Sequence, residues 1–78
     1  MSMITDLVKH VVAGLVEKPE EIVVTESGEG QKHVVEVRLA KQDLGKVIGK
    51  DGQTIRAIRA LLHAVNPDVR DIVLTAIE

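Results

Sequence analysis

Two glycines, Gly49 and Gly52, interrupt a stretch that otherwise has the pattern of one continuous helix. Apolar residues recur at helical spacing on both sides of the pair, over residues 44–48 and again over 55–62. A glycine inside a helix costs roughly 1 kcal/mol relative to alanine, and glycine accepts backbone angles that other residues avoid. The pattern therefore predicts two helices joined by a sharp corner, with the first N–H groups of the second helix exposed there.

Such a corner is a candidate phosphate site, because the positive end of the helix dipole attracts anions and Lys50 lies between the two glycines. Two nucleotide-binding patterns fail on their spacing. A P-loop has four residues before Gly-Lys-Ser/Thr, whereas three residues separate Gly45 from Gly49, and Asp51 offers no hydroxyl. The dinucleotide fingerprint Gly-x-Gly-x-x-Gly is not met either. The phosphate must therefore belong to another kind of ligand.

The charge distribution fits a polyanionic partner. The chain has a net charge of −2, but residues 41–59 contain five Lys or Arg against two Asp and are net positive. A basic patch on an acidic body can bind a polyanion locally, although a solvated helix face can give the same count. Phe, Tyr and Trp are absent, which excludes the aromatic base-stacking surfaces of RRM, OB and cold-shock domains. Nucleic-acid binding would have to use backbone, aliphatic and charged groups.

The sequence offers little for catalysis or for a cofactor. There is no cysteine, and His10, His33 and His63 fall on different predicted elements without metal-ligand spacing or an evident acid–base partner. We therefore expect no enzyme activity, no metal and no cofactor. A secretory signal and a long apolar run are also missing, so the expected location is the cytoplasm and no membrane contact is expected.

The whole chain, residues 1–78, reads as one small α+β domain. Along the chain, the spacing of apolar residues alternates between the period of a helix and the period of two that is typical of strands. In order they are a helix over 3–17, a strand over 21–27, a turn at 28–30, a strand over 33–40, helices over 41–48 and 53–65, and a strand over 69–77. This α-β-β-α-α-β order predicts three helices on one face of a three-stranded sheet, with an antiparallel hairpin and a last strand parallel to the second.

Two of these elements have predicted faces. In the second strand, alternation places His33, Val35, Val37 and Leu39 toward the core. In the helix over 53–65 the residues predicted to point inward are Ile55, Ile58, Leu61, Leu62 and Val65. On its other side, a basic stripe is predicted to point outward and to start at the glycine corner; its members are Arg56, Arg59 and His63.

The segment 47–55, Val-Ile-Gly-Lys-Asp-Gly-Gln-Thr-Ile, resembles the signature of KH domains, in which two aliphatic residues precede Gly-x-x-Gly and another follows three positions later. The element order resembles the type II, prokaryotic KH arrangement. Over its full length the chain is similar to the small single-domain KH proteins of bacteria, the KhpA or YlqC-like family. This resemblance implies binding of single-stranded RNA without catalysis, a role as an RNA chaperone or post-transcriptional regulator, a homodimer, and a second KH-containing partner of the KhpB (Jag) type.

The resemblance also implies roles for particular residues. The loop residues Gly49, Lys50, Asp51 and Gly52 would hold the sugar-phosphate backbone, and the acidic Asp51 leaves Lys50 as the only cation at the tip. An aliphatic wall for the bases would comprise Leu44, Val47, Ile48 and Ile55, with edge hydrogen bonds from the second strand. Three further cations would extend the phosphate track: Lys46, Arg56 and Arg59. The alternative is a protein-interaction or dimerisation module with little RNA affinity, because the last strand and part of the helix over 53–65 are apolar.

Overall fold

The predicted α+β order is present in the computed structural model, which describes residues 3–28, 32–67 and 71–78. The helices are α1 (Met3–Ala13), α2 (Leu44–Ile48) and α3 (Gln53–Val65), and the strands are β1 (Val23–Ser27), β2 (Lys32–Arg38) and β3 (Asp71–Ile77). Single 3₁₀ turns precede β1, α2 and α3; they are η1 (Pro19–Glu21), η2 (Lys41–Asp43) and η3 (Lys50–Gly52). The predicted turn at 28–30 and the first residues of the predicted strand 69–77 fall partly outside the described residues.

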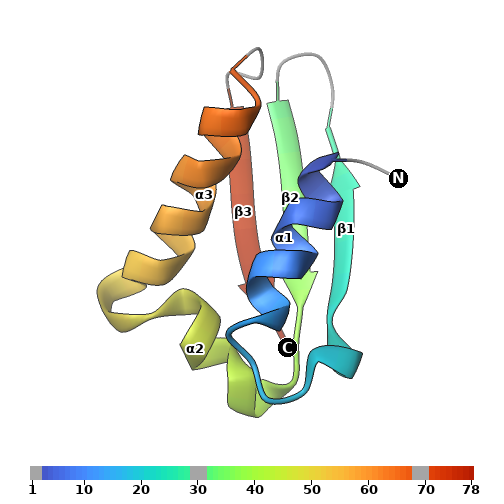
Figure 1. Ribbon diagram of the computed structural model, residues 1–78, viewed down its shortest axis with the longest axis vertical. Coiled ribbons are helices and arrows are strands. Elements are labelled where there is room, and N and C mark those ends of the chain that lie inside the picture. The colour runs from blue at the N-terminus through green and yellow to red at the C-terminus, as the bar shows by residue number, and fades with distance from the viewer. Residues whose placement is uncertain (1–2, 29–31, 68–70) are drawn as a thin grey trace.

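The three strands form one sheet in the order β1-β2-β3. β1 and β2 pair antiparallel, with Val24 opposite Val37, and β2 and β3 pair parallel, with Val35 opposite Leu74. Both orientations were predicted and are confirmed. Figure 1 shows α1 and α3 side by side over one face of this sheet, with α2 at its lower end. Since β2 is paired on both sides, β1 and β3 are the edge strands.

The core lies between the helices and the sheet because the apolar residues of each element repeat on one side. In α1 they recur every four residues, in β2 every two, and in α3 after four, as the periods of a helix and a strand require. The central members are Ile4, Val8 and Val12 of α1, Val35 and Val37 of β2, and Ile58 and Leu62 of α3, with Leu39, Val47 and Ile72 beside them. The predicted inward face of the second strand is confirmed, with His33 half-buried at its start.

The sequence prediction was wrong about two helical details. α1 ends at Ala13 instead of residue 17, because the N–H groups of Gly14 and Leu15 bond three residues back, to Val11 and Val12, and turn the chain away. In α3, Leu61 and Val65 were predicted to point inward but are 42% and 41% exposed. Apolar periodicity indicates a stripe without giving its width, and the buried stripe of α3 is narrow.

Candidate nucleic-acid interface

The loop between α2 and α3 has a backbone conformation that its glycines make possible. Gly49 has φ 77° and ψ 172°, and Gly52 has φ 76° and ψ 15°. Asp51 also has a positive φ, 55°, which aspartate tolerates better than most residues do. A Cβ atom on Gly49 would overlap the side-chain hydroxyl of Thr54 and lie 2.9 Å from its backbone nitrogen. The chain can therefore turn this closely onto α3 only without a side chain at Gly49.

The loop uses some of its own backbone donors. The N–H of Gly49 donates to the carbonyl of Gly45 at 2.8 Å and closes α2, and the N–H of Gly52 donates to the carbonyl of Gly49 at 3.2 Å. The N–H of Gln53 donates to the carbonyl of Lys50. The sequence prediction did not foresee these internal bonds. The tip is nevertheless accessible, since Lys50, Asp51 and Gln53 are exposed, and the positive end of the α3 dipole points toward it.

Three exposed cations follow one another from the loop along α3. Lys50 is at the tip, Arg56 follows in the first turns of the helix, and Arg59 lies one turn further on. An Nη atom of Arg56 lies 3.2 Å from the position that a Cβ on Gly52 would occupy, so its guanidinium folds back beside the loop. Within the described parts of the chain, none of the three has a salt-bridge partner. Their charges are available to an external anion.

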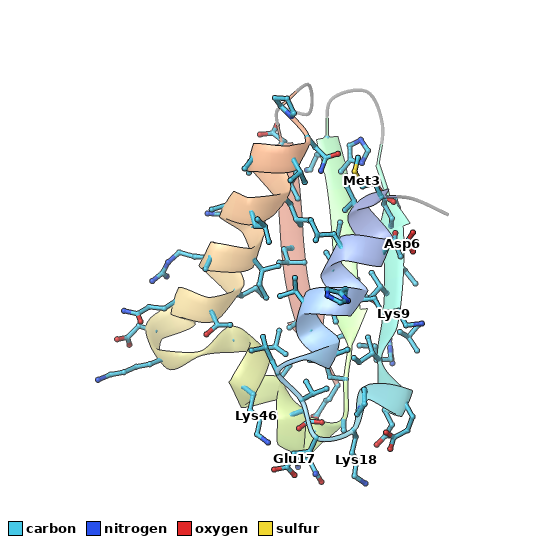
Figure 2. The ribbon with its side chains drawn as sticks, in the orientation of Figure 1. Met3, Asp6, Lys9, Glu17, Lys18 and Lys46 are labelled. Carbon is cyan, nitrogen blue, oxygen red and sulfur yellow. The ribbon has the colours of Figure 1, made fainter. Side chains whose placement is uncertain are left out.

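Lys46, the fourth cation predicted for this track, is already paired inside the protein. Its Nζ lies 2.8 Å from an Oε of Glu17 and 3.6 Å from an Oδ of Asp43. Figure 2 shows Lys46 and Glu17 together at the lower end of the molecule. The hydrogen bond to Glu17 and the two nearby carboxylates raise the pKa of Lys46. Its charge is therefore balanced internally, unlike those of Lys50 and Arg56.

Asp43 fixes the start of α2 to the segment that follows α1. Its side chain is fully buried, and its two Oδ atoms accept the backbone N–H groups of Glu17 and Lys18, each at 3.0 Å. These hydrogen bonds, with a contribution from nearby Lys46, lower the pKa of the Asp43 carboxyl against the opposing effect of burial. The sequence identified Asp43 only as an acidic residue near a helix start. The start of α2, the helix that leads into the loop, is thus anchored by backbone groups that lie 25 and 26 residues earlier in the chain.

The aliphatic residues predicted as a wall for bases differ in their access to a ligand. Val47 is 1% exposed and belongs to the core, so it presents no surface. Leu44, Ile48 and Ile55 are half-buried and retain some exposed surface beside the loop. The predicted wall is therefore reduced to three side chains.

The structure adds a cleft that the sequence did not indicate. It has a volume of about 540 Å³ and lies between α3 and β3, with Arg56, Arg59, Ala60, His63, Asp71 and Ile72 as its lining. The predicted source of edge hydrogen bonds, the second strand, is paired on both sides, whereas β3 has a free edge. Ala60, Asp71 and Ile72 were missed because the position of β3 at the edge beside α3 follows from the tertiary fold. The alternating N–H and C=O groups of a strand edge are well suited to base edges.

Two negative observations complete the description. Among residues 3–28, 32–67 and 71–78, no group of three His, Asp or Glu side chains is placed to hold a metal ion. None of the helices in those ranges has the length and apolar character needed to cross a bilayer.

Comparison with known proteins places the chain in a family. Residues 5–71 match the family model described as "KhpA/KhpB, KH domain". The chain belongs to the KhpA/KhpB family of KH domains. The RNA-binding protein KhpA of Thermotoga maritima is 39% identical over 72 residues, covering 92% of this chain and 96% of that protein. KhpA of Treponema pallidum is 43% identical over 65 residues, covering 82% and 80%, and KhpA of Streptomyces coelicolor is 38% identical over 63 residues, covering 81% and 80%.

These relatives are named RNA-binding proteins, and the KH family is not one of enzymes, in agreement with the sequence prediction. The type of fold and the resemblance to the KhpA family are likewise confirmed. No solved structure gives a significant match to this chain.

Proposed function

We propose that the chain binds single-stranded RNA with the loop 49–52 and the adjoining cleft between α3 and β3. One observation carries the proposal: Lys50 in the loop and Arg56 beside it have no counter-ion among the described residues, and the loop has a conformation that its glycines permit, directly beside the cleft. The naming of the KhpA relatives as RNA-binding proteins supports it. The ligand would lie with its phosphates at the loop and its bases toward the cleft.

The proposed mechanism combines electrostatic attraction with shape. A phosphate at the loop meets Lys50, Arg56 and the positive end of the α3 dipole, and the next phosphate meets Arg59. The bases then contact Leu44, Ile48 and Ile55 and approach the free edge of β3. With so few phosphate contacts, affinity on the order of micromolar is expected, and it should decrease with salt. Lys46 joins the track only if a phosphate displaces Glu17 from it.

Reversing the charge at Lys50 tests this function. Lys50→Asp should weaken binding of a short unstructured RNA at least about tenfold, because it removes a phosphate partner and adds an anion at the tip. Fluorescence anisotropy measures the binding, and circular dichroism checks the fold, which should be unchanged because Lys50 is exposed. Lys9→Asp is the matched control, since Lys9 is an exposed lysine on α1, away from the loop (Figure 2).

Three results separate the candidate functions. If Lys50→Asp weakens binding and Lys9→Asp does not, the loop is the RNA site. If both variants bind RNA as the unmodified chain does, the proposed site is wrong. Weak or no RNA binding by the unmodified chain, together with self-association, would favour the alternative of a protein-interaction module.

We also propose that the chain acts as a homodimer, or with a second KH protein of the KhpB type, as a cytoplasmic RNA chaperone or post-transcriptional regulator. The outer surface of α3 supports the dimer, because four neighbouring residues on it are exposed and uncharged: Ala57, Leu61, Ala64 and Val65. Small apolar side chains on a helix allow a second helix to approach closely. The family model that the chain matches covers both KhpA and KhpB, which supports a KhpB-type partner.

A further inference from the structure

The cleft between α3 and β3 contains an aromatic ring that the phosphate track does not use. His63, in the last turn of α3, lines the cleft together with Arg56, Arg59 and Ala60 of the same helix. The residue is half-buried, so part of its surface remains accessible at the cleft. Within the described parts of the chain, its imidazole makes no hydrogen bond and no ion pair. The ring is therefore available to a ligand.

Proteins that bind single-stranded RNA often hold bases by stacking them on planar side chains, among them histidine. This chain has no Phe, Tyr or Trp, so its three histidines supply the only aromatic rings. His10 is exposed on α1, outside the cleft, and Nδ1 of His33 lies 2.9 Å from an Oε of Glu26. Among the residues that the structure describes, His63 is therefore the aromatic side chain that is placed to stack on a base.

The position of His63 suits the base of a nucleotide whose phosphate is held by Arg59. The two residues are four positions apart on α3, which is about one helical turn or ~6 Å along the axis. Ala60 lies on the same side of the helix and also lines the cleft, and its small side chain leaves room for a flat ring. A nucleotide bound at Arg59 can thus turn its base into the cleft against the imidazole.

We propose that His63 is a base-stacking residue of the RNA site, with its imidazole lying flat against the base next to the phosphate at Arg59. The inference rests on the proposed RNA-binding function and adds a residue that contacts a base. Stacking tolerates every base, because each has a π face, so this contact should add affinity without reading the sequence.

Three substitutions at His63 separate a ring from a charge. His63→Ala removes the ring and should weaken binding of a short unstructured RNA about fivefold or more. His63→Phe restores a ring without a charge or a hydrogen bond and should recover most of that loss. His63→Lys supplies a charge without a ring and should not recover it. Fluorescence anisotropy measures the affinities, and circular dichroism checks that each variant is folded.

His10→Ala is the matched control, since it removes an imidazole that is exposed on α1 and does not line the cleft. This variant should bind RNA as the unmodified chain does.

NMR of the unmodified chain gives a second readout that requires no substitution. With isotope-labelled protein and unlabelled RNA, the aromatic signals come only from histidine rings, because Phe, Tyr and Trp are absent. The ring protons of His63 should move upfield when RNA is added, since protons that lie over the face of a base are shielded by it. Those of His10 should stay in place. This measurement tests the inference even if a substitution at His63 disturbs the fold.

Two results overturn the inference while leaving RNA binding in place. In one, His63→Ala binds RNA as the unmodified chain does, or His63→Lys recovers the loss and His63→Phe does not, which is a contact by charge. In the other, the ring protons of His63 do not move upfield when the protein is saturated with RNA. If the unmodified chain binds no RNA, the proposed function fails as well.

Discussion

At Gly49 the backbone conformation and the packing both exclude a side chain. Its φ of 77° combined with ψ of 172° belongs to a region that is essentially restricted to glycine. In addition, a Cβ atom there would collide with Thr54. Gly45, four residues earlier in α2, is the opposite case, because its backbone is helical and a Cβ would meet no atom within 4 Å. The fold therefore requires glycine at position 49 but not at position 45.

The same substitution at these two positions should change stability in opposite directions. Gly49→Ala should destabilise the fold by about 1–3 kcal/mol or more, lowering the melting temperature by about 4–8 °C for each kcal/mol. Gly45→Ala should stabilise it by up to about 1 kcal/mol, because alanine favours the helix. Thermal unfolding followed by circular dichroism measures both. Equal effects of the two substitutions would contradict the role assigned to Gly49.

The link between α1 and α2 depends on one charged side chain. The Asp43 carboxylate accepts hydrogen bonds from the backbone of Glu17 and Lys18, and its pKa is lowered from 3.8 by these bonds and by Lys46. Because the folded protein favours the ionised form, Asp43 contributes stability at pH values above 3.8. That contribution is lost as the pH falls through the lower pKa of the folded state.

Asp43→Asn removes this charge and places an NH₂ group against a backbone N–H. We expect the variant to be less stable than the unmodified chain at pH 7, and the difference between them to shrink as the pH falls below 3.8. Urea unfolding at neutral and acidic pH gives the two curves. Other carboxylates titrate in both proteins and so largely cancel in the difference. A difference that stays constant with pH would show that the ionised form of Asp43 does not matter.

The sequence predicted the elements that depend on local signals. The bounds of α3 were predicted to the residue, because Gly52 precedes the helix and Asn66 and Pro67 follow it. The strand orientations followed from the hairpin and from the long crossover between the second and third strands. The cation track from Lys50 to Arg59 could also be read from helical spacing, because these residues are close together along the chain.

The features that the sequence left unresolved depend on contacts between distant segments. The partners of Asp43 are backbone N–H groups, which have no sequence signature. The pairing of Lys46 with Glu17 joins two elements whose distance the sequence does not give. The cleft requires Asp71 and α3 to be neighbours, which only the complete sheet brings about. The half of the proposed site that lies on β3 therefore became visible only in three dimensions.

At the scale of the whole molecule, three sides of α3 have different surroundings. Ile58 and Leu62 enter the core, Arg56 and Arg59 line the cleft, and Leu61 remains exposed on a third side. The proposed RNA site and the proposed dimer surface therefore use different sides of one helix. A 78-residue chain buries a limited fraction of its surface, so association through the third side would add to a small core. The two functions should be separable by mutation.

Leu61→Asp should convert a homodimer into a monomer, because a twofold contact places the two new charges close together in an apolar interface. Leu15→Asp is the matched control, since Leu15 is exposed to a similar extent, 40% against 42%, but lies beyond the end of α1. Analytical ultracentrifugation at equal concentrations gives the oligomeric state. The monomeric variant should still bind a short RNA, because Lys50, Arg56 and the cleft are unchanged. A monomeric unmodified chain, or a Leu61→Asp variant that still dimerises, would rule out this surface of α3 as the dimer interface.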